Sequence, residues 1–307
     1  MTGEENAPWP QRTITELQDG TNSIDIRAWD EVSPYIREGD IVVNTFPKSG
    51  TTWMLQLILQ MINNGEETLF APDNTLRHAT SWIENMLIAP TDTVAKFKLT
   101  PPHHRRLIKS HLQLDALLFS PKIKYVCVFR DGRDVVMSLY NHCMSQTAEY
   151  RNATLKDAKL DDFTFFYENW LLHGNQPFWT DYFHHIQSWW KYANSCDNIL
   201  LVNYNEMQRN LTHVILKLAK FLGIPVDEAS VSFRQILHHT SFEYMKQHED
   251  LFEPPLNVMK QGNFIHKGVK GRWRDVLSES QHRMYWDKIR QCWPPELIEF
   301  VHKDSSL

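Results

Sequence analysis

Three segments of the chain share one pattern of apolar and polar positions: a short apolar run, a polar turn, and apolar residues at helical spacing. The apolar runs are residues 40–46, 124–129 and 198–202, and the helical patterns are 51–63, 135–142 and 211–222. Polar turns are expected between them, at 47–50, 130–134 and 203–207. Gly223 and Pro225 close the third helix, because glycine accepts the left-handed cap and proline cannot continue a helix. With a further strand at 106–111, the alternation predicts a mostly parallel sheet covered by helices on both faces.

Aromatic residues are dense between positions 162 and 192. At helical spacing such residues are more often core than part of a ligand site, so we expect them to pack in the interior. No low-complexity segment, fixed-period repeat or linker divides the chain. We therefore predict one α/β domain over residues 1–307, with a central, mostly parallel sheet flanked by helices.

Composition limits the partners. The chain has 32 Lys and Arg against 37 Asp and Glu, a formal net charge of −5, so no overall positive field attracts nucleic acid or an anionic membrane. Any anion site must be built locally. The four cysteines lack zinc-ligand spacing and favour free thiols in a reducing compartment. No apolar stretch approaches the ~20 residues that span a bilayer, and no signal peptide is recognisable. We expect a cytoplasmic protein.

Residues 45–53 read T-F-P-K-S-G-T-T-W between a predicted strand and a predicted helix. Backbone N–H groups in such a turn and at the following helix N-terminus favour an anion. A Walker A loop has its lysine after the last glycine, whereas Lys48 precedes Gly50 by two residues and the first glycine is absent. The loop therefore predicts an anion site unlike that of ordinary ATP or GTP hydrolases. The alternative is a strand–helix turn with a chance lysine.

Two further features converge on this loop. Lys109 and His111 are two residues apart in a predicted strand, so they project from the same face and suit acid–base work on an anion. Arg130 follows another strand, and Ser138 lies about two turns into the next helix. Both can face the crevice outside the carboxyl ends of the strands, where open α/β sheets bind ligands.

Six motifs follow one another along the chain: residues 46–53 (FPKSGTTW), 108–112 (IKSHL), 130–141 (RDGRDVVMSLYN), 203–207 (NYNEM), 239–242 (HTSF) and 265–273 (IHKGVKGRW). Together and in this order they resemble the cytosolic sulfotransferase family. The resemblance implies 3′-phosphoadenosine 5′-phosphosulfate (PAPS) as sulfuryl donor, 3′-phosphoadenosine 5′-phosphate (PAP) as product, a P-loop-like phosphosulfate-binding loop, and no metal. It also implies a small-molecule acceptor.

The resemblance also implies roles for individual residues. The 5′-phosphosulfate would be held by Lys48, Ser49, Gly50, Thr51 and Thr52, and the 3′-phosphate by Arg130, Ser138, Lys267 and Gly268. Trp53 and Phe242 would enclose the adenine, with Tyr204 and Thr240 as polar contacts. His111 would act as general base. Lys48 would neutralise the leaving phosphate oxygen, Lys109 would steady the sulfuryl oxygens, and Ser138 would restrain Lys48 until the acceptor arrives. Lysines can here do what magnesium does in kinases, since such transfer depends on positioning and charge.

The chain departs from the family pattern in places. His266 stands where the family has arginine, and either faces the 3′-phosphate or points to solvent. Gln113 replaces a usual proline, and the family's C-terminal dimerisation motif is not recognisable, so the oligomeric state stays open. The least family-like segments, near 82–84, 142–150 and 244–264, would line the acceptor pocket and leave the acceptor, a hydroxyl or an amine, unspecified.

Rival functions use the same residues differently. A nucleoside or small-molecule kinase would need a Walker-type loop and magnesium ligands, and the loop is missing. A non-catalytic nucleotide-binding module would not require His111. Paired histidines at 103–104, 184–185 and 238–239 raise the possibility of a metal site, but adjacent strand residues point to opposite faces and no ligand spacing accompanies them.

Overall fold

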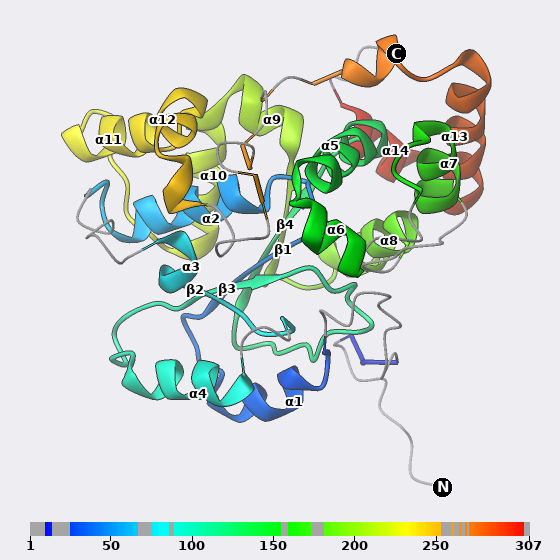
Figure 1. The fold of residues 1–307 in the computed structure, drawn as a ribbon. Coiled ribbons are helices and arrows are strands. Elements are labelled where there is room, and N and C mark those ends of the chain that lie inside the picture. The colour runs from blue at the N-terminus through cyan, green and yellow to red at the C-terminus, as the bar shows by residue number, and fades with distance from the viewer. Residues whose placement is uncertain are drawn as a thin grey trace, which may run out of the picture.

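Five parallel strands form one central sheet in the computed structural model, and helices cover both of its faces (Figure 1). The strand order is β2-β3-β1-β4-β5. The structure describes residues 10–13, 25–66, 75–85, 89–154, 159–172, 181–252, 259–260, 264–265, 268 and 270–303. The predicted single α/β domain with a parallel sheet is confirmed.

The bounds of the elements are as follows. The strands are β1 Ile41–Thr45, β2 Thr80–Trp82, β3 Leu107–Ser110, β4 Lys124–Phe129 and β5 Ile199–Asn203. The α-helices are α1 Ala28–Val32, α2 Thr51–Ile62, α3 Leu76–Ala79, α4 Pro90–Leu99, α5 Gly132–Ser145, α6 Ala148–Thr154, α7 Phe163–Tyr167, α8 Tyr182–Ala193, α9 Tyr204–Arg209, α10 Leu211–Leu222, α11 Val231–His239, α12 Phe242–Gln247, α13 Glu279–Cys292 and α14 Pro295–His302. Short 3₁₀ turns are η1 Ser33–Tyr35, η5 Glu249–Leu251 and η6 Arg272–Asp275, and η4 Glu168–Leu172 is a π-helix.

Several elements differ from the sequence predictions, among them the strand predicted at 106–111, which ends at Ser110 in β3 and leaves His111 just outside it. The edge strand β2 was not predicted, because three residues carry too little periodicity. The predicted turn at 130–134 is shorter, because the Asp131 carboxylate accepts the Arg133 backbone N–H and caps α5, which begins at Gly132. The predicted turn at 203–207 is the start of α9, which Asn203 caps in the same way. Gly223 adopts the left-handed cap of α10 as predicted, with φ 63°.

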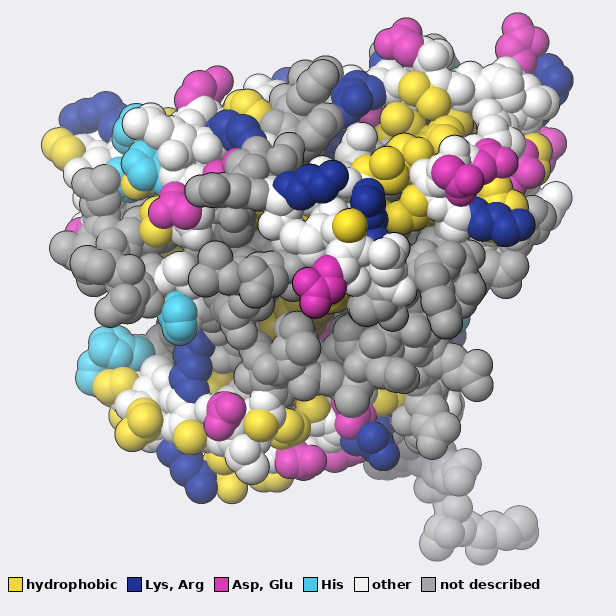
Figure 2. Space-filling model, in the orientation of Figure 1, with side chains coloured by type: hydrophobic (Ala, Val, Ile, Leu, Met, Phe, Trp, Pro, Cys, Tyr) yellow, Lys and Arg dark blue, Asp and Glu magenta, His cyan; other side chains and the backbone are white. Residues whose placement is uncertain are grey.

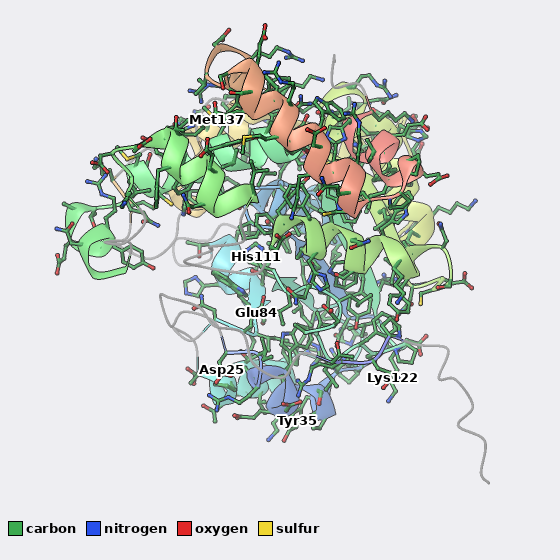
Figure 3. The ribbon with its side chains drawn as sticks, turned by 90° about the vertical axis from the view of Figure 1, so that its right-hand side faces the viewer. Asp25, Tyr35, Glu84, His111, Lys122 and Met137 are labelled. Atoms are coloured by element: carbon green, nitrogen blue, oxygen red, sulfur yellow. The ribbon has the colours of Figure 1, made fainter. Side chains whose placement is uncertain are left out.

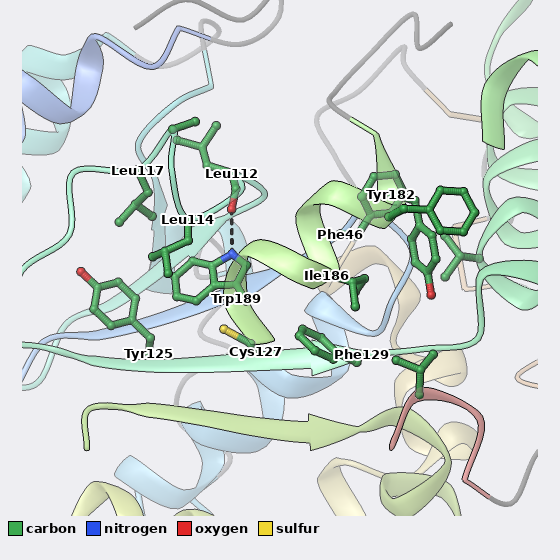
Figure 4. Close-up of a cluster of buried hydrophobic side chains, with 14 of the residues drawn as sticks. Phe46, Leu112, Leu114, Leu117, Tyr125, Cys127, Phe129, Tyr182, Ile186 and Trp189 are labelled. Carbon is green, nitrogen blue, oxygen red and sulfur yellow. Dashed lines mark hydrogen bonds between the residues drawn. The ribbon is translucent and has the colours of Figure 1, made fainter. Parts of the chain in front are cut away.

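Alternate residues of each strand face opposite layers of the core. In β1, Val42 packs into one cluster, while Ile41 and Val43 pack into the other. The first layer holds α1, α5, α8, α13 and α14 against the sheet, and the second holds α2, α10 and α11. Trp189 of α8 is buried in the first layer and its indole N–H donates to the Leu112 carbonyl (Figure 4).

The aromatic-rich segment forms core where the structure describes it. The buried members are Phe166, Tyr167, Tyr182, Phe183 and Trp189. Positions 173–180 lie outside the described residues. On the face drawn in Figure 2, basic and acidic side chains are interspersed, which agrees with the small net charge of the chain.

The strand order brings the predicted motifs to one edge of the sheet. After β1 the chain crosses toward β2 and β3, and after β4 it crosses the other way to β5, so the connections diverge between β1 and β4. At such a point the loops at the carboxyl ends separate and leave room for a ligand. The loop after β1 carries Lys48, and the turn after β4 carries Arg130.

Candidate active site

The turn between β1 and α2 has the backbone of an anion site. Lys48 and Gly50 both adopt left-handed conformations, with φ 67° and 106°, on either side of Ser49. Such turns direct successive N–H groups toward one point, and a left-handed lysine is the kind of backbone strain found at ligand sites. Among the described residues no side chain caps the N-terminus of α2, where Thr51 and Thr52 lie. The Ser49 hydroxyl is buried and makes no hydrogen bond to any described residue. These features fit a bound phosphate or sulfate group.

The Lys48 ammonium lies 3.3 Å from Nδ1 of His142 on α5. The pKa of Lys48 is lowered to about 8, mainly by burial, with a smaller increase from Cys143 and a smaller decrease from Arg130. Lys48 thus stays mainly protonated at neutral pH. Burial also holds the pKa of His142 well below its usual value, so its ring is neutral and accepts a hydrogen bond from the Lys48 ammonium. Ser138 is half-buried on the same helix, and no hydrogen bond joins it to Lys48 in the part of the chain that the structure describes.

His111 lies directly after β3 with its orientation fixed. Its Nδ1 is 2.8 Å from the Thr45 carbonyl oxygen. Because a carbonyl only accepts, Nδ1 carries the proton and Nε2 carries the lone pair. Burial, and then the Lys109 charge, hold the pKa of His111 well below its usual value, which keeps the ring neutral and basic at Nε2.

Trp82 separates His111 from Lys109. The Lys109 ammonium lies 3.6 Å from the centre of the indole ring, and the His111 ring meets the indole edge-on at 5.3 Å between centroids. Lys109 and His111 thus both contact Trp82, although β3 ends at Ser110 and His111 lies just outside the strand. Burial lowers the pKa of Lys109 to about 7, while the Glu84 carboxylate raises it and Lys48 lowers it.

The second half of the site gathers around Tyr204. The Arg130 guanidinium lies over the Tyr204 ring at 4.3 Å and donates to the Lys48 carbonyl at 2.9 Å. Its Nε is buried without a hydrogen bond to any described residue. Gly50 approaches the same ring so closely that a Cβ there would lie 2.9 Å from it. Trp53 meets the ring edge-on at 5.8 Å. Tyr204 therefore contacts both the loop of residues 45–53, called the phosphate loop below, and the turn that begins at Arg130.

The remaining predicted nucleotide contacts extend this surface. The Trp53 indole N–H donates to the Thr240 carbonyl at 2.9 Å. Phe242 leaves 40% of its surface exposed beside Gly268, whose missing Cβ would lie 2.6 Å from the ring. An exposed aromatic ring suits stacking on a flat base. His266 and Lys267 lie outside the described residues, so their predicted contacts stay predictions.

A family model for the sulfotransferase domain matches residues 38–293 of the chain. The chain belongs to the sulfotransferase family. It is 30% identical over 263 residues to mouse sulfotransferase 2B1, covering 83% of this chain and 72% of that protein. It is 25% identical over 307 residues to a glycolipid sulfotransferase of Mycobacterium bovis, covering 90% of each chain.

Two solved structures share the fold. The structure of mouse sulfotransferase SULT7A1 complexed with PAP has a TM-score of 0.67 and 24% identity, covering 92% of this chain and 96% of that one. The structure of retinol dehydratase with androsterone and inactive cofactor PAP has a TM-score of 0.65 and 21% identity, covering 92% and 87%. The predicted P-loop-like sulfotransferase fold and the predicted class of enzyme, a PAPS-dependent sulfotransferase, are confirmed.

The described residues of the sulfotransferase contain no group of three or more His, Cys, Asp or Glu side chains arranged to hold a metal ion. They also contain no helix with the length and apolar character needed to cross a membrane. All four cysteines are free thiols.

Two residues of the site escaped the sequence prediction. Glu84 belongs to a segment expected to line the acceptor pocket. It is fully buried next to His111, and its carboxylate accepts the backbone N–H of His111 at 2.7 Å and the Trp29 indole N–H at 3.1 Å (Figure 3). Burial raises the pKa of Glu84, and those hydrogen bonds lower it. Its one signal was a carboxylate inside an apolar run. His142 also belongs to a segment expected to line the acceptor pocket, and its hydrogen bond with Lys48 was not predicted.

Proposed function

We propose that this sulfotransferase transfers the sulfuryl group of PAPS to a hydroxyl or amine of a small-molecule acceptor, with His111 as the general base. The observation that carries the proposal is the orientation of His111. Its Nδ1 proton is bound by the Thr45 carbonyl at the start of the phosphate loop, so Nε2 carries the lone pair, and the charges of Lys109 and Lys48 act on the ring. A neutral, oriented imidazole in a positively charged site suits proton removal near an anionic donor.

The phosphosulfate would be held by the loop residues Lys48, Ser49, Gly50, Thr51 and Thr52. Their support is the left-handed backbone, the uncapped start of α2 and the unpaired Ser49 hydroxyl.

The rest of the nucleotide would lie on the surface around Tyr204. Arg130, Ser138 and Gly268, with His266 and Lys267, would hold the 3′-phosphate, and the unpaired Arg130 Nε supports this placement. Trp53 and Phe242 would enclose the adenine, with Tyr204 and Thr240 beside it.

When bound, PAPS supplies an activated sulfuryl group whose bridging S–O bond breaks as the acceptor oxygen or nitrogen bonds to sulfur. His111 Nε2 takes the acceptor proton. Lys48 balances the negative charge left on the phosphate oxygen of PAP, and Lys109 balances charge on the sulfuryl oxygens. An anion at the site favours protonated His111 and so strengthens it as a base during transfer.

The test is turnover with sulfur-labelled PAPS across panels of phenols, alcohols and amines, with and without EDTA, and in parallel with ATP and magnesium. We expect labelled product from PAPS that survives EDTA. Phosphorylated product from ATP and magnesium, with none from PAPS, would mean a kinase. Tight PAP binding without turnover of any acceptor would favour a binding module. A cytoplasmic location and the acceptor's identity stay predictions.

A further inference from the structure

The C-terminal helix α14, Pro295–His302, lies beyond the region matched by the family model, which ends at residue 293. It nevertheless packs against α13 and contributes to the core beneath α5 (Figure 1). Its last residue, His302, is buried, and a buried imidazole needs hydrogen-bond partners. What this imidazole contacts indicates why it is buried.

A chain of hydrogen bonds runs from His302 to the turn after Arg130. His302 Nδ1 lies 2.8 Å from the Ile298 carbonyl oxygen, so Nδ1 carries the proton and Nε2 accepts. The Tyr285 hydroxyl, 2.9 Å away, therefore donates to Nε2. The same hydroxyl accepts the Gly132 N–H at 3.2 Å. In this arrangement the Tyr285 hydroxyl donates to His302 and accepts from Gly132, so removing the imidazole takes away the acceptor for the hydroxyl proton.

The turn itself is tightly packed. Gly132 has no room for a side chain, because a Cβ there would lie 2.7 Å from the Tyr182 ring. The Tyr182 hydroxyl donates to the Arg130 carbonyl at 2.5 Å. Asp131 and Arg133 form a buried ion pair at 2.7 Å, and Arg133 stacks on Trp273 at 3.7 Å. The backbone that follows Arg130 is thus held by two tyrosines, one of which donates to His302.

The end of α14 also contacts the residues on either side of Tyr204. The carboxamide N–H groups of Asn203 donate to the carbonyls of Phe300 and Val301, at 2.5 and 3.2 Å. Asn205 donates to the Lys303 carbonyl at 2.9 Å. These amides satisfy carbonyls that the end of α14 would otherwise leave unpaired. They flank Tyr204, the ring over which Arg130 lies.

We propose that α14 positions the nucleotide's 3′-phosphate site. His302 fixes the turn that carries Arg130, and the hydrogen bonds of Asn203 and Asn205 to the end of α14 fix the backbone on either side of Tyr204. The proposal rests on the proposed function, in which Arg130 binds the 3′-phosphate. His302 touches neither nucleotide nor acceptor and acts through Tyr285 and Gly132. The helix at the end of the chain therefore contributes to selection of a 3′-phosphorylated nucleotide.

The test compares the affinity of PAP with that of adenosine 5′-phosphate, which lacks the 3′-phosphate, by calorimetry on the full chain. For His302→Leu we expect PAP binding to weaken about tenfold, the order expected when a buried hydroxyl loses its acceptor. Binding of adenosine 5′-phosphate should stay within about twofold on the same reasoning. Tyr285→Phe should have the same selective effect, and the double variant should be no worse than either single one.

His302→Gln is the matched rescue, because its amide oxygen can occupy the place of Nε2 and accept from Tyr285. It should restore the preference for PAP. Glu299→Gln, an exposed change on the same helix, should leave both affinities unchanged. If His302→Leu does not fold, Tyr285→Phe, which removes one oxygen atom, provides the same measurement.

The outcomes separate the two proposals. Wild-type protein that binds PAP and adenosine 5′-phosphate equally would overturn the 3′-phosphate site and with it the proposed function. Wild type that prefers PAP, with Tyr285→Phe and His302→Leu keeping that preference while only melting at a lower temperature, would overturn the role of α14 alone. A selective loss of PAP affinity, restored by glutamine, would support it.

Discussion

The Lys48 ammonium donates a hydrogen bond to Nδ1 of His142, although the two residues lie 94 positions apart, one on the phosphate loop and the other on α5. The imidazole accepts because burial keeps it neutral. The lysine proposed to neutralise the leaving phosphate is therefore held by a histidine. The family resemblance implies this restraint for Ser138.

Replacing His142 should change the pH dependence of the reaction. His142→Phe removes the acceptor for a buried ammonium, so the pKa of Lys48 should fall below its present value of about 8. The basic limb of kcat/KM for PAPS, which reports ionisations of the free enzyme, should move to lower pH. His142→Asn, whose side-chain oxygen can take the place of Nδ1, should keep the native profile. An unchanged profile in His142→Phe would mean that Ser138 or the bound donor, rather than His142, sets the state of Lys48.

His111→Ala should reduce kcat by ~10²–10⁴, the usual loss when a general base is removed. Calorimetric affinity for PAP should change little, because the imidazole faces the acceptor proton rather than the nucleotide. His111→Gln, which can still hydrogen bond but cannot carry a proton, is the control and should be as slow as alanine. Near-native kcat in either variant would assign the base elsewhere.

The sequence predicted the parts of the site that lie next to one another along the chain. The loop 45–53 and the Arg130 turn each follow a buried strand, and both reach the carboxyl edge because strand direction and order are constrained in parallel sheets. The Lys109–His111 pair followed from strand alternation alone.

Contacts between distant segments could not be predicted in this way. Glu84 meets the His111 N–H only because β2 lies beside β3, and a three-residue edge strand leaves no periodic signal. His302 meets the Gly132 turn through a tyrosine on another helix. Such pairings depend on how helices pack over the sheet, and hydrophobic spacing within one segment carries no information about that.

Glu84→Gln tests the buried carboxylate. Glutamine has one acceptor oxygen for two N–H donors, those of His111 and Trp29, so one of them loses its partner. The change also removes the negative charge that raises the pKa of Lys109, so this pKa should fall below about 7. We expect a lower kcat and a basic limb shifted to lower pH, with PAP affinity nearly native. A pH profile identical to wild type would show that Glu84 does not influence Lys109.

Gly50→Ala should impair donor binding. Its φ of 106° is unfavourable for any L side chain, and the new methyl would lie 2.9 Å from the Tyr204 ring. The loop or the ring must shift, and both belong to the nucleotide surface. We expect KM for PAPS to rise at least tenfold, roughly the effect of 1–3 kcal/mol of local strain. Gly39→Ala is a suitable control, because φ there is also positive, at 91°, but nothing lies within 4 Å of the new methyl. Equal effects of the two changes on KM would attribute the loss to backbone strain in general.

Lys109→Met should abolish turnover but stabilise the fold. Burial lowers the pKa of Lys109 to about 7, below its ordinary value of about 10.4 in an unfolded chain. Between these two values the unfolded chain binds a proton that the folded chain does not, so wild-type stability should rise with pH across this window. Below about pH 7 both states are charged, and the folded protein bears the full cost of a charged lysine.

The stabilisation by Lys109→Met should therefore be largest at pH 6.5 and smaller at pH 9. Because Lys109 keeps part of its surface accessible, water reduces the size of the effect but not its sign. Thermal unfolding of wild type and variant at both pH values measures it. Lys98→Met, on the exposed surface of α4, is the matched control and should show no such pH dependence. A stability gain that is the same at both pH values would mean that methionine packs better there, and that the charge of Lys109 carries no folding cost. A gain confined to low pH, together with lost activity, would show that the site retains a destabilising lysine because the reaction needs its charge.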